Sequence, residues 1–184
     1  MNWTKEYLRR FGPQKSAPGL SMNDRVEPTG HLSIKVIDAK TQEIVQQIEK
    51  HNLVVNGGRT ALSRLFGGYD VANRKIAQMT FGDGVTAPAV TDTALAGTVI
   101  ITVNTPGSGI TTHFDGPLFP GGSPDTKVQF VGTVGVDDGN GSGSQNYTEA
   151  GLLTGDATLA TRTVFGLITK TNQLVVVGTW TITF

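Results

Sequence analysis

The C-terminal stretch 173–184, QLVVVGTWTITF, constrains the fold of this chain more than any other part of the sequence. Read with a period of two, it separates an apolar face from a Val/Thr face. The apolar face comprises Leu174, Val176, Gly178, Trp180, Ile182 and Phe184. This alternation is typical of a β-strand with one side in a core, and β-branched residues suit a pleated sheet better than a helix. Because chain ends fray unless they are tied down, we expect a central or barrel-closing strand with Trp180 in the core.

Similar runs recur along the chain, separated by many of its 24 glycines, which follow no period. This composition is typical of an all-β chain with tight turns. The stretch 43–49 also fits a helix, but it follows a turn at hairpin distance, which favours a strand. We expect strands over residues 31–37, 43–49, 76–81, 98–103, 126–136, 145–153 and 156–165, with 168–172 turning into the final strand. The sequence therefore predicts a mainly β domain over 31–184, an antiparallel two-sheet β-sandwich of jelly-roll-like topology, with an immunoglobulin-type sandwich as the alternative.

Two segments inside this domain differ from the strands. Residues 56–66, NGGRTALSRLF, predict one short helix, capped by Asn56 and carrying an apolar stripe that includes Leu62 and Leu65. Residues 104–125 predict a long loop rich in Pro and Gly. Loops of this length tend to be functional or to pack on a partner, so the apolar residues of this one are interface candidates.

Residues 1–30 form a separate N-terminal arm and linker. Residues 1–11 predict an amphipathic helix that ends at Gly12-Pro13, followed by a linker without periodicity. A floppy tail is the simpler interpretation. We favour an arm that orders against a neighbouring subunit, because exposed aromatic side chains are costly and aromatics are enriched at interfaces. The candidate interface residues of the whole chain are Trp3, Tyr7, Leu8, Phe11, Phe114, Leu118 and Phe119.

The sequence offers no motif for catalysis. There is no Gly-x-Ser-x-Gly, His-Glu-x-x-His or phosphate-binding loop motif, and His31, His51 and His113 are far apart in sequence without ligand spacing. Gly82-Asp83-Gly84 lacks the Lys and the following helix of a phosphate loop. We therefore expect a protein that is not an enzyme, with no catalytic residues and no cofactor.

The loop at 137–143 superficially resembles a calcium loop. It lacks the spaced oxygens and the terminal bidentate Glu of an EF-hand. A weak cation site at Asp137, Asp138 and Asn140 is the alternative to a flexible turn, and the turn is favoured. No metal site is therefore predicted.

Charge and composition restrict the partners. Fifteen basic and fifteen acidic residues cancel, so the net charge provides no positive electrostatic potential that would attract nucleic acid or an anionic membrane. A net charge of zero favours association with other proteins. No window approaches the length of a membrane span. The chain has no cysteine, which suits synthesis in a reducing cytoplasm. We expect a homo-oligomer that binds other proteins, without nucleic acid or membrane partners.

Four stretches carry a family resemblance: EKHNLVVNGGRTALSRLF, MTFGDGVTAPAVTDTALAG, QNYTEAGLL and LATRTVFGLITKTNQLVVVGTWTITF. Over about residues 31–184 the chain resembles small β-rich virion structural proteins of tailed bacteriophages. The resemblance implies a protein of the virion, made in the host cytoplasm. It implies a capsid decoration (cement) protein, typically a homotrimer, that binds the major capsid protein and strengthens the shell. A neck, collar, tail or baseplate structural protein is the alternative, and a carbohydrate-binding module for host attachment is a third. The resemblance names no catalytic residues.

Overall fold

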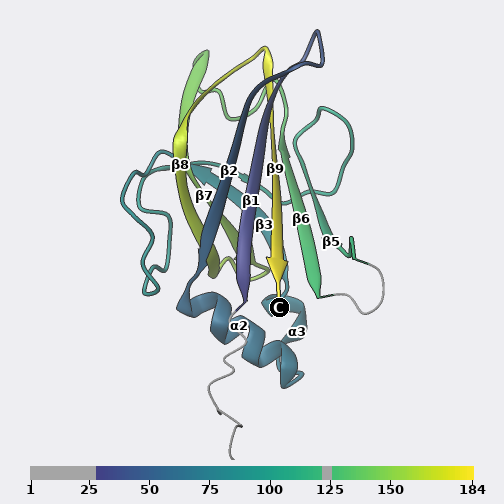
Figure 1. The fold of residues 1–184 in the computed structure, drawn as a ribbon, viewed down its shortest axis with the longest axis vertical. Helices are drawn as coiled ribbons and strands as arrows, with labels where there is room; N and C mark the ends of the chain where they lie inside the picture. The colour runs from purple at the N-terminus through teal and green to yellow at the C-terminus, as the bar shows by residue number, and fades with distance from the viewer. Residues whose placement is uncertain (1–27, 122–125) are drawn as a thin grey trace, which may run out of the picture.

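The structure is a computed structural model and describes residues 28–121 and 126–184. Nine antiparallel strands join in the spatial order β4-β3-β7-β8-β2-β1-β9-β6-β5 (Figure 1). Their bounds are β1 (Thr29–Asp38), β2 (Ile44–Val54), β3 (Ile76–Gly82), β4 (Val99–Val103), β5 (His113–Leu118), β6 (Lys127–Val134), β7 (Ser144–Thr154), β8 (Leu159–Thr171) and β9 (Leu174–Thr183). The prediction of a mainly β, antiparallel domain is confirmed.

The predicted two-sheet sandwich is not confirmed, because all nine strands belong to one curved sheet that is nearly closed into a barrel. β2 pairs with β1 over most of its length and with β8 through Leu53 and Val54. The two ends of the sheet then face each other across the core. A side-chain carbon added at Gly132 in β6 would lie 2.7 Å from the Met79 sulfur in β3. Periodicity alone gives the face of each strand but not its neighbour, so closure was not predictable from it.

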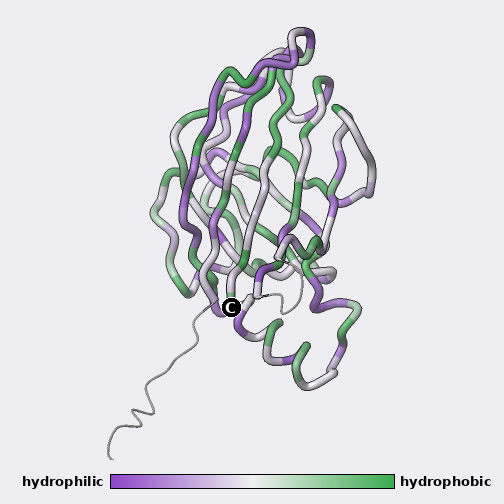
Figure 2. The backbone as a smooth tube through the Cα atoms, turned by 45° about the vertical axis from the view of Figure 1, so that its right-hand side comes forward, coloured by the Kyte–Doolittle hydropathy of each residue, from purple (hydrophilic) through white to green (hydrophobic). Residues whose placement is uncertain are grey.

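The core lies inside this barrel, and β9 runs through its wall between β1 and β6. Val176, Gly178, Trp180 and Ile182 are buried, as the alternation predicts, and Trp180 has no exposed surface. Val175, which the alternation places on the opposite face, is buried as well. Hydrophobic and hydrophilic residues follow one another along the strands in the tube of Figure 2. Phe184 lies beyond the end of the strand and is 46% exposed, so the buried face ends at Ile182, two residues earlier than expected.

Two predicted boundaries were wrong. The predicted loop 104–125 contains β5, which pairs with β6 from His113 onward. The predicted strand 156–165 and turn 168–172 form one strand, β8. Its pairing with β7 shifts register between Tyr147 and Glu149, and Gly166 and Leu167 are exposed there, so the apolar alternation is interrupted without ending the strand.

The predicted helix is confirmed as α2 (Asn56–Phe66), and a four-residue helix, α3 (Val71–Arg74), follows it. Asn56 is not the cap: Val55 occupies that position, and no side-chain hydrogen bond caps the helix. Both helices lie at one end of the barrel, beside the chain's C-terminus (Figure 1). We call this end the base. Among the described residues, no helix has the length and apolar character needed to cross a membrane.

Candidate functional site: an apolar cavity at the base

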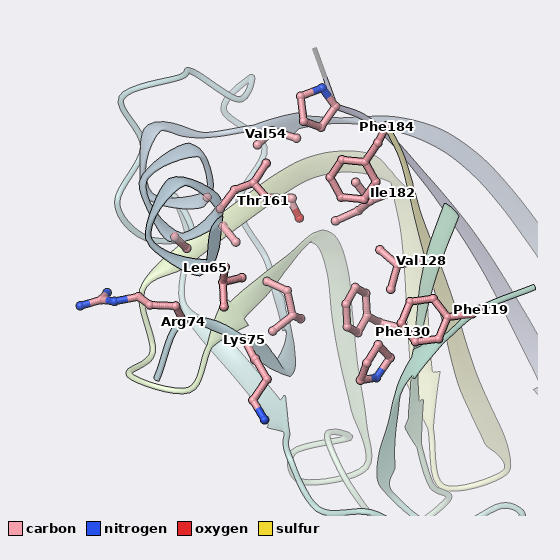
Figure 3. A pocket seen from close by; sticks show the side chains of 17 residues that line it. Val54, Leu65, Arg74, Lys75, Phe119, Val128, Phe130, Thr161, Ile182 and Phe184 are labelled. Carbon is pink, nitrogen blue, oxygen red and sulfur yellow. The ribbon is translucent and has the colours of Figure 1, made fainter. Parts of the chain in front are cut away.

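A cavity of about 310 Å³ opens at the base, between α2 and the ends of β6 and β9 (Figure 3). We call it the base cavity. Its walls are almost entirely apolar. They include Ala61, Leu62, Leu65, Val128, Phe130 and Ile182. The volume lies at the small end of the range for ligand pockets in proteins, which suits a few side chains or one small apolar group.

The cavity exists because α2 contacts β8 through glycine rather than through its apolar stripe. A side-chain carbon at Gly58 would lie 2.2 Å from the carbonyl oxygen of Ala160, and one at Gly57 would lie 2.3 Å from that of Leu159. The glycines allow the helix backbone to rest directly on the strand. Leu62 and Leu65 are consequently left half-buried and face the cavity.

The opposite wall comes from the sheet. Phe130 of β6 is buried, and its ring stacks on Phe114 with centroids 6.1 Å apart and planes 8° from parallel. Such a pair is held in place by its neighbours on the barrel interior. The cavity therefore has one wall formed by the packed core of the barrel. The other wall is formed by the face of α2 whose leucine side chains are only half-buried.

The rim is apolar on one side and charged on the other. Phe119 is 66% exposed and Phe184 is 46% exposed. On the α3 side, Arg74 and Lys75 turn their charged ends away from the cavity (Figure 3). Arg74 pairs with Asp156 at 2.6 Å and with Asp70 at 3.5 Å. No charge therefore enters the cavity itself.

One hydroxyl group in the cavity wall is unsatisfied among the described residues. Thr161 of β8 is only 1% exposed, and its Oγ1 has no hydrogen-bond partner among the described residues. Figure 3 shows its hydroxyl oxygen directed between α2 and Ile182. Buried polar atoms are almost always hydrogen-bonded in native proteins. The base cavity thus combines apolar walls with one orphan hydroxyl.

A second buried cluster, of charged side chains, lies where the loop 83–98 covers β7 and β8. Glu149 has no exposed surface and accepts hydrogen bonds from the backbone N–H groups of Gly84 (3.0 Å), Ala96 (3.0 Å) and Gly97 (2.7 Å). Arg162 donates to Glu149 from Nε at 2.9 Å and contacts it through Nη2 at 2.8 Å. We call Glu149, Arg162 and Asp92 the charged cluster.

Asp92 and the loop backbone complete this cluster. Arg162 donates to the Asp92 carboxylate at 2.8 Å and to the Thr86 carbonyl at 2.8 Å. The backbone N–H of Ala89, and then Arg162, lower the pKa of Asp92. Every charge in the cluster is thus engaged by protein groups, and the cluster anchors the loop. The sequence signal for this cluster is a Glu and an Arg at inward positions of apolar strands, which matches no short catalytic or metal-binding motif.

A third buried charge, Lys170, organises the opposite end of the barrel. Its ammonium donates to the carbonyls of Thr171 (2.8 Å) and Val136 (3.2 Å). Burial lowers the pKa of Lys170, and the nearby Asp138 and Asp137 oppose that shift. Asn140 donates to the Val136 carbonyl at 3.1 Å. Among the described residues no group of three or more His, Cys, Asp or Glu could hold a metal ion.

The candidate interface residues fall in three places. Trp3, Tyr7, Leu8 and Phe11 lie outside the described residues. Leu118 and Phe119 are exposed near the base, and Phe119 lines the base cavity. Phe114 lies inside the barrel against Phe130 and offers no surface to a partner.

Two of the three histidines, His31 and His51, are closer together than their separation in the sequence suggests. The rings of His31 and His51 lie 5.6 Å apart on neighbouring strands, and His31 Nε2 lies 3.2 Å from Glu49. The Ser33 hydroxyl donates to the same carboxylate at 2.7 Å. Because the hydroxyl bonds the carboxylate and not the imidazole, the group lacks the arrangement that activates a serine nucleophile.

Comparisons of the chain with protein-family models, with curated proteins and with solved structures found no match. The function is therefore argued from the site and from the sequence. The base, with its apolar cavity and exposed aromatic rim, is the candidate site, and its chemistry suits the binding of apolar groups.

Proposed function

We propose that this chain is a non-enzymatic structural protein of a bacteriophage virion, acting as a capsid decoration (cement) protein. One observation carries the proposal: Phe119 and Phe184 stand exposed around an open apolar cavity, at the end of the barrel where residues 1–27 join it. Exposed apolar patches around a concave site are typical of protein–protein contact surfaces. The base is then the surface that meets neighbouring virion subunits.

Two further points support this role over a chemical one. The resemblance of residues 31–184 to phage virion proteins favours a partner among capsid subunits, with the major capsid protein as the first candidate. The buried ionisable groups Glu149, Arg162 and Lys170 are each bonded to other parts of the fold. Such groups stabilise architecture, whereas a general acid or base must reach a substrate. A homotrimer with arms from residues 1–30 on neighbouring subunits is the proposed assembly.

The test replaces the rim aromatics in the full chain and measures its occupancy on assembled particles. Phe119→Ser with Phe184→Ser should lower the copy number at least tenfold, because the apolar contact with the neighbouring subunit is lost. The matched control is Val85→Ser with Ile110→Ser, two exposed apolar residues on loops away from the base cavity. Incorporation of the rim variant at wild-type occupancy would rule out the base as the contact surface.

The copy number itself separates the shell from the neck, collar, tail or baseplate. Hundreds of copies per particle support decoration of the capsid, and about a dozen or fewer support the alternative. A carbohydrate-binding module is less favoured, because Trp180 is fully buried and cannot stack on a sugar.

A further inference from the structure

We propose that residues 1–11 of this chain dock in the base cavity of the same chain, where an aromatic side chain fills the apolar space and donates a hydrogen bond to Thr161 Oγ1. This intramolecular docking goes beyond the proposed function and holds for the isolated protein. It covers the aromatic face of the arm before any neighbouring subunit is present.

The chemistry of the base cavity selects the occupant. Its walls are apolar, and among the described residues the only side-chain oxygen that lines it belongs to Thr161, which is 1% exposed and has no partner there. A purely aliphatic group would fill the space but would leave this hydroxyl unsatisfied. Trp and Tyr combine a large apolar body with one hydrogen-bond donor, and they usually find a partner for it when buried.

The N-terminal segment carries that combination. Trp3, Tyr7 and Phe11 recur every four residues, a spacing that predicts a shared face for them in a helical segment. Trp3 and Tyr7 each bring a donor, and Phe11 adds apolar surface. The described part of the chain uses its own Trp, Trp180, in the core.

The covalent connection through residues 12–27 keeps the N-terminal segment close to the base cavity. Pro28, the first described residue, lines the base cavity itself, so the arm begins at the mouth of the site. The stretch 12–27 can span at most on the order of 55 Å when extended, and its glycines and prolines allow the chain to turn back. A tether of this kind gives an effective concentration in the millimolar range. Docking in the same chain is therefore favoured over capture of a free partner.

The experiment uses the full chain labelled with 5-fluorotryptophan, which gives one fluorine NMR resonance for Trp3 and one for Trp180. Trp3→Phe assigns the two signals. We expect the Trp3 resonance to be displaced from that of a synthetic peptide of residues 1–11 and to lose the shift between H₂O and D₂O that marks an exposed indole. The buried Trp180 reports in every sample that the barrel is folded.

Matched variants locate the docking site. Leu65→Asp places a charge in the cavity wall and should return Trp3 to the position of the free peptide, whereas Ser63→Asp, exposed on the same helix, should not. Thr161→Val keeps the shape and removes the hydroxyl, so the ratio of docked to free arm should fall roughly two- to tenfold. Tyr7→Ser with Phe11→Ser should release Trp3 without any substitution in the described domain. This double variant tests the docking even if Leu65→Asp does not fold.

Dilution distinguishes the same chain from a second copy. An intramolecular contact keeps the Trp3 signal unchanged over a hundredfold dilution. A Trp3 resonance that matches the free peptide in the wild type, or one that becomes free on dilution, would overturn the proposal. These measurements need no virus particle, so their failure leaves the proposed role of the rim in assembly to its own test.

Discussion

The charged cluster and the base cavity are both interior-like regions, but they differ in how their polar atoms are satisfied. In the charged cluster, Glu149 and Arg162 lie out of solvent and bond to each other, to Asp92 and to the backbone of the loop 83–98. In the base cavity, apolar walls surround space, and the Thr161 hydroxyl has no partner among the described residues. The described residues satisfy the charges of the first region, whereas they leave apolar space and one unpaired hydroxyl in the second.

This difference distinguishes buried residues that stabilise the fold from residues that are available to bind a partner. Buried charged side chains are often candidates for catalytic groups. In this protein their hydrogen bonds are made to other groups of the fold. Removing a partner from such a cluster is costly because it leaves an uncompensated charge. The exposed residues at the rim of the base cavity contribute less to the free energy of unfolding. They can therefore contact a partner without a large effect on stability.

The largest effect is expected for Arg162→Met. Glu149 would remain buried without its cation, and we expect the free energy of unfolding to fall by about 3–5 kcal/mol, measured by urea denaturation. Arg59→Met, at an exposed position of α2, is the control and should change stability by less than about 0.5 kcal/mol. If both variants are equally stable, the charged cluster does not anchor the loop.

A smaller loss is expected for Gly97→Ala, which tests the backbone side of the same cluster. The added carbon would lie 2.3 Å from the backbone nitrogen of Gly84, where both glycines donate to Glu149. We expect a loss of about 1–3 kcal/mol from overpacking. Gly166→Ala, with nothing within 4 Å of the new carbon, should be neutral or slightly stabilising in the same thermal or urea measurement.

The pH dependence of stability should report Asp92. Its pKa is lowered in the folded state, first by the Ala89 N–H and then by Arg162. A carboxyl with a depressed folded pKa contributes stability above its unfolded pKa, near 4, and loses it as the pH falls through the folded value. The difference in unfolding free energy between wild type and Asp92→Asn should therefore be constant above about pH 5 and shrink below about pH 4. A difference that stays constant down to pH 2 would contradict the pairing.

The smallest effect on stability is expected at the rim of the base cavity. Phe119 is 66% exposed, so Phe119→Ser should change the unfolding free energy by no more than about 0.5 kcal/mol. The same substitution, combined with Phe184→Ser, is expected to reduce particle occupancy strongly. Calorimetry and particle occupancy should be measured on the same preparation. We expect the rim substitutions to lower occupancy while the free energy of unfolding stays nearly unchanged. A large loss of stability at Phe119 would instead make the rim part of the core.

Local patterns predicted the elements whose signal lies within a few residues. The alternation around Trp180 placed β9 and its buried face, and the stripe around Leu62 gave α2 with its observed bounds. β5 was missed because its sequence, with a Gly-Pro step, carries little strand propensity, and among the described strands it pairs only with β6. The continuous β8 was missed because Gly166 and Leu167 interrupt the alternation at a shift of register.

The candidate interface residues of the predicted loop 104–125 fall in different environments. The exposed position of Phe119 agrees with the apolar loop being available to a partner, whereas Phe114 turned inward because β5 pairs with β6 and its inner face meets Phe130. The Glu149–Arg162 pair required strands β7 and β8 to be neighbours. No spacing in the sequence contains that information.

The sequence by itself determined the mainly β class, the position of Trp180 in the core and the apolar stripe of α2, because side-chain periodicity follows from backbone geometry alone. Tertiary structure alone decided that the sheet curves nearly into a barrel, that α2 rests on β8 through Gly57 and Gly58, and that Thr161 faces an open apolar space. These features depend on which strands become neighbours and how closely two backbones approach. Such contacts join residues distant in the chain, and only the folded packing brings them together.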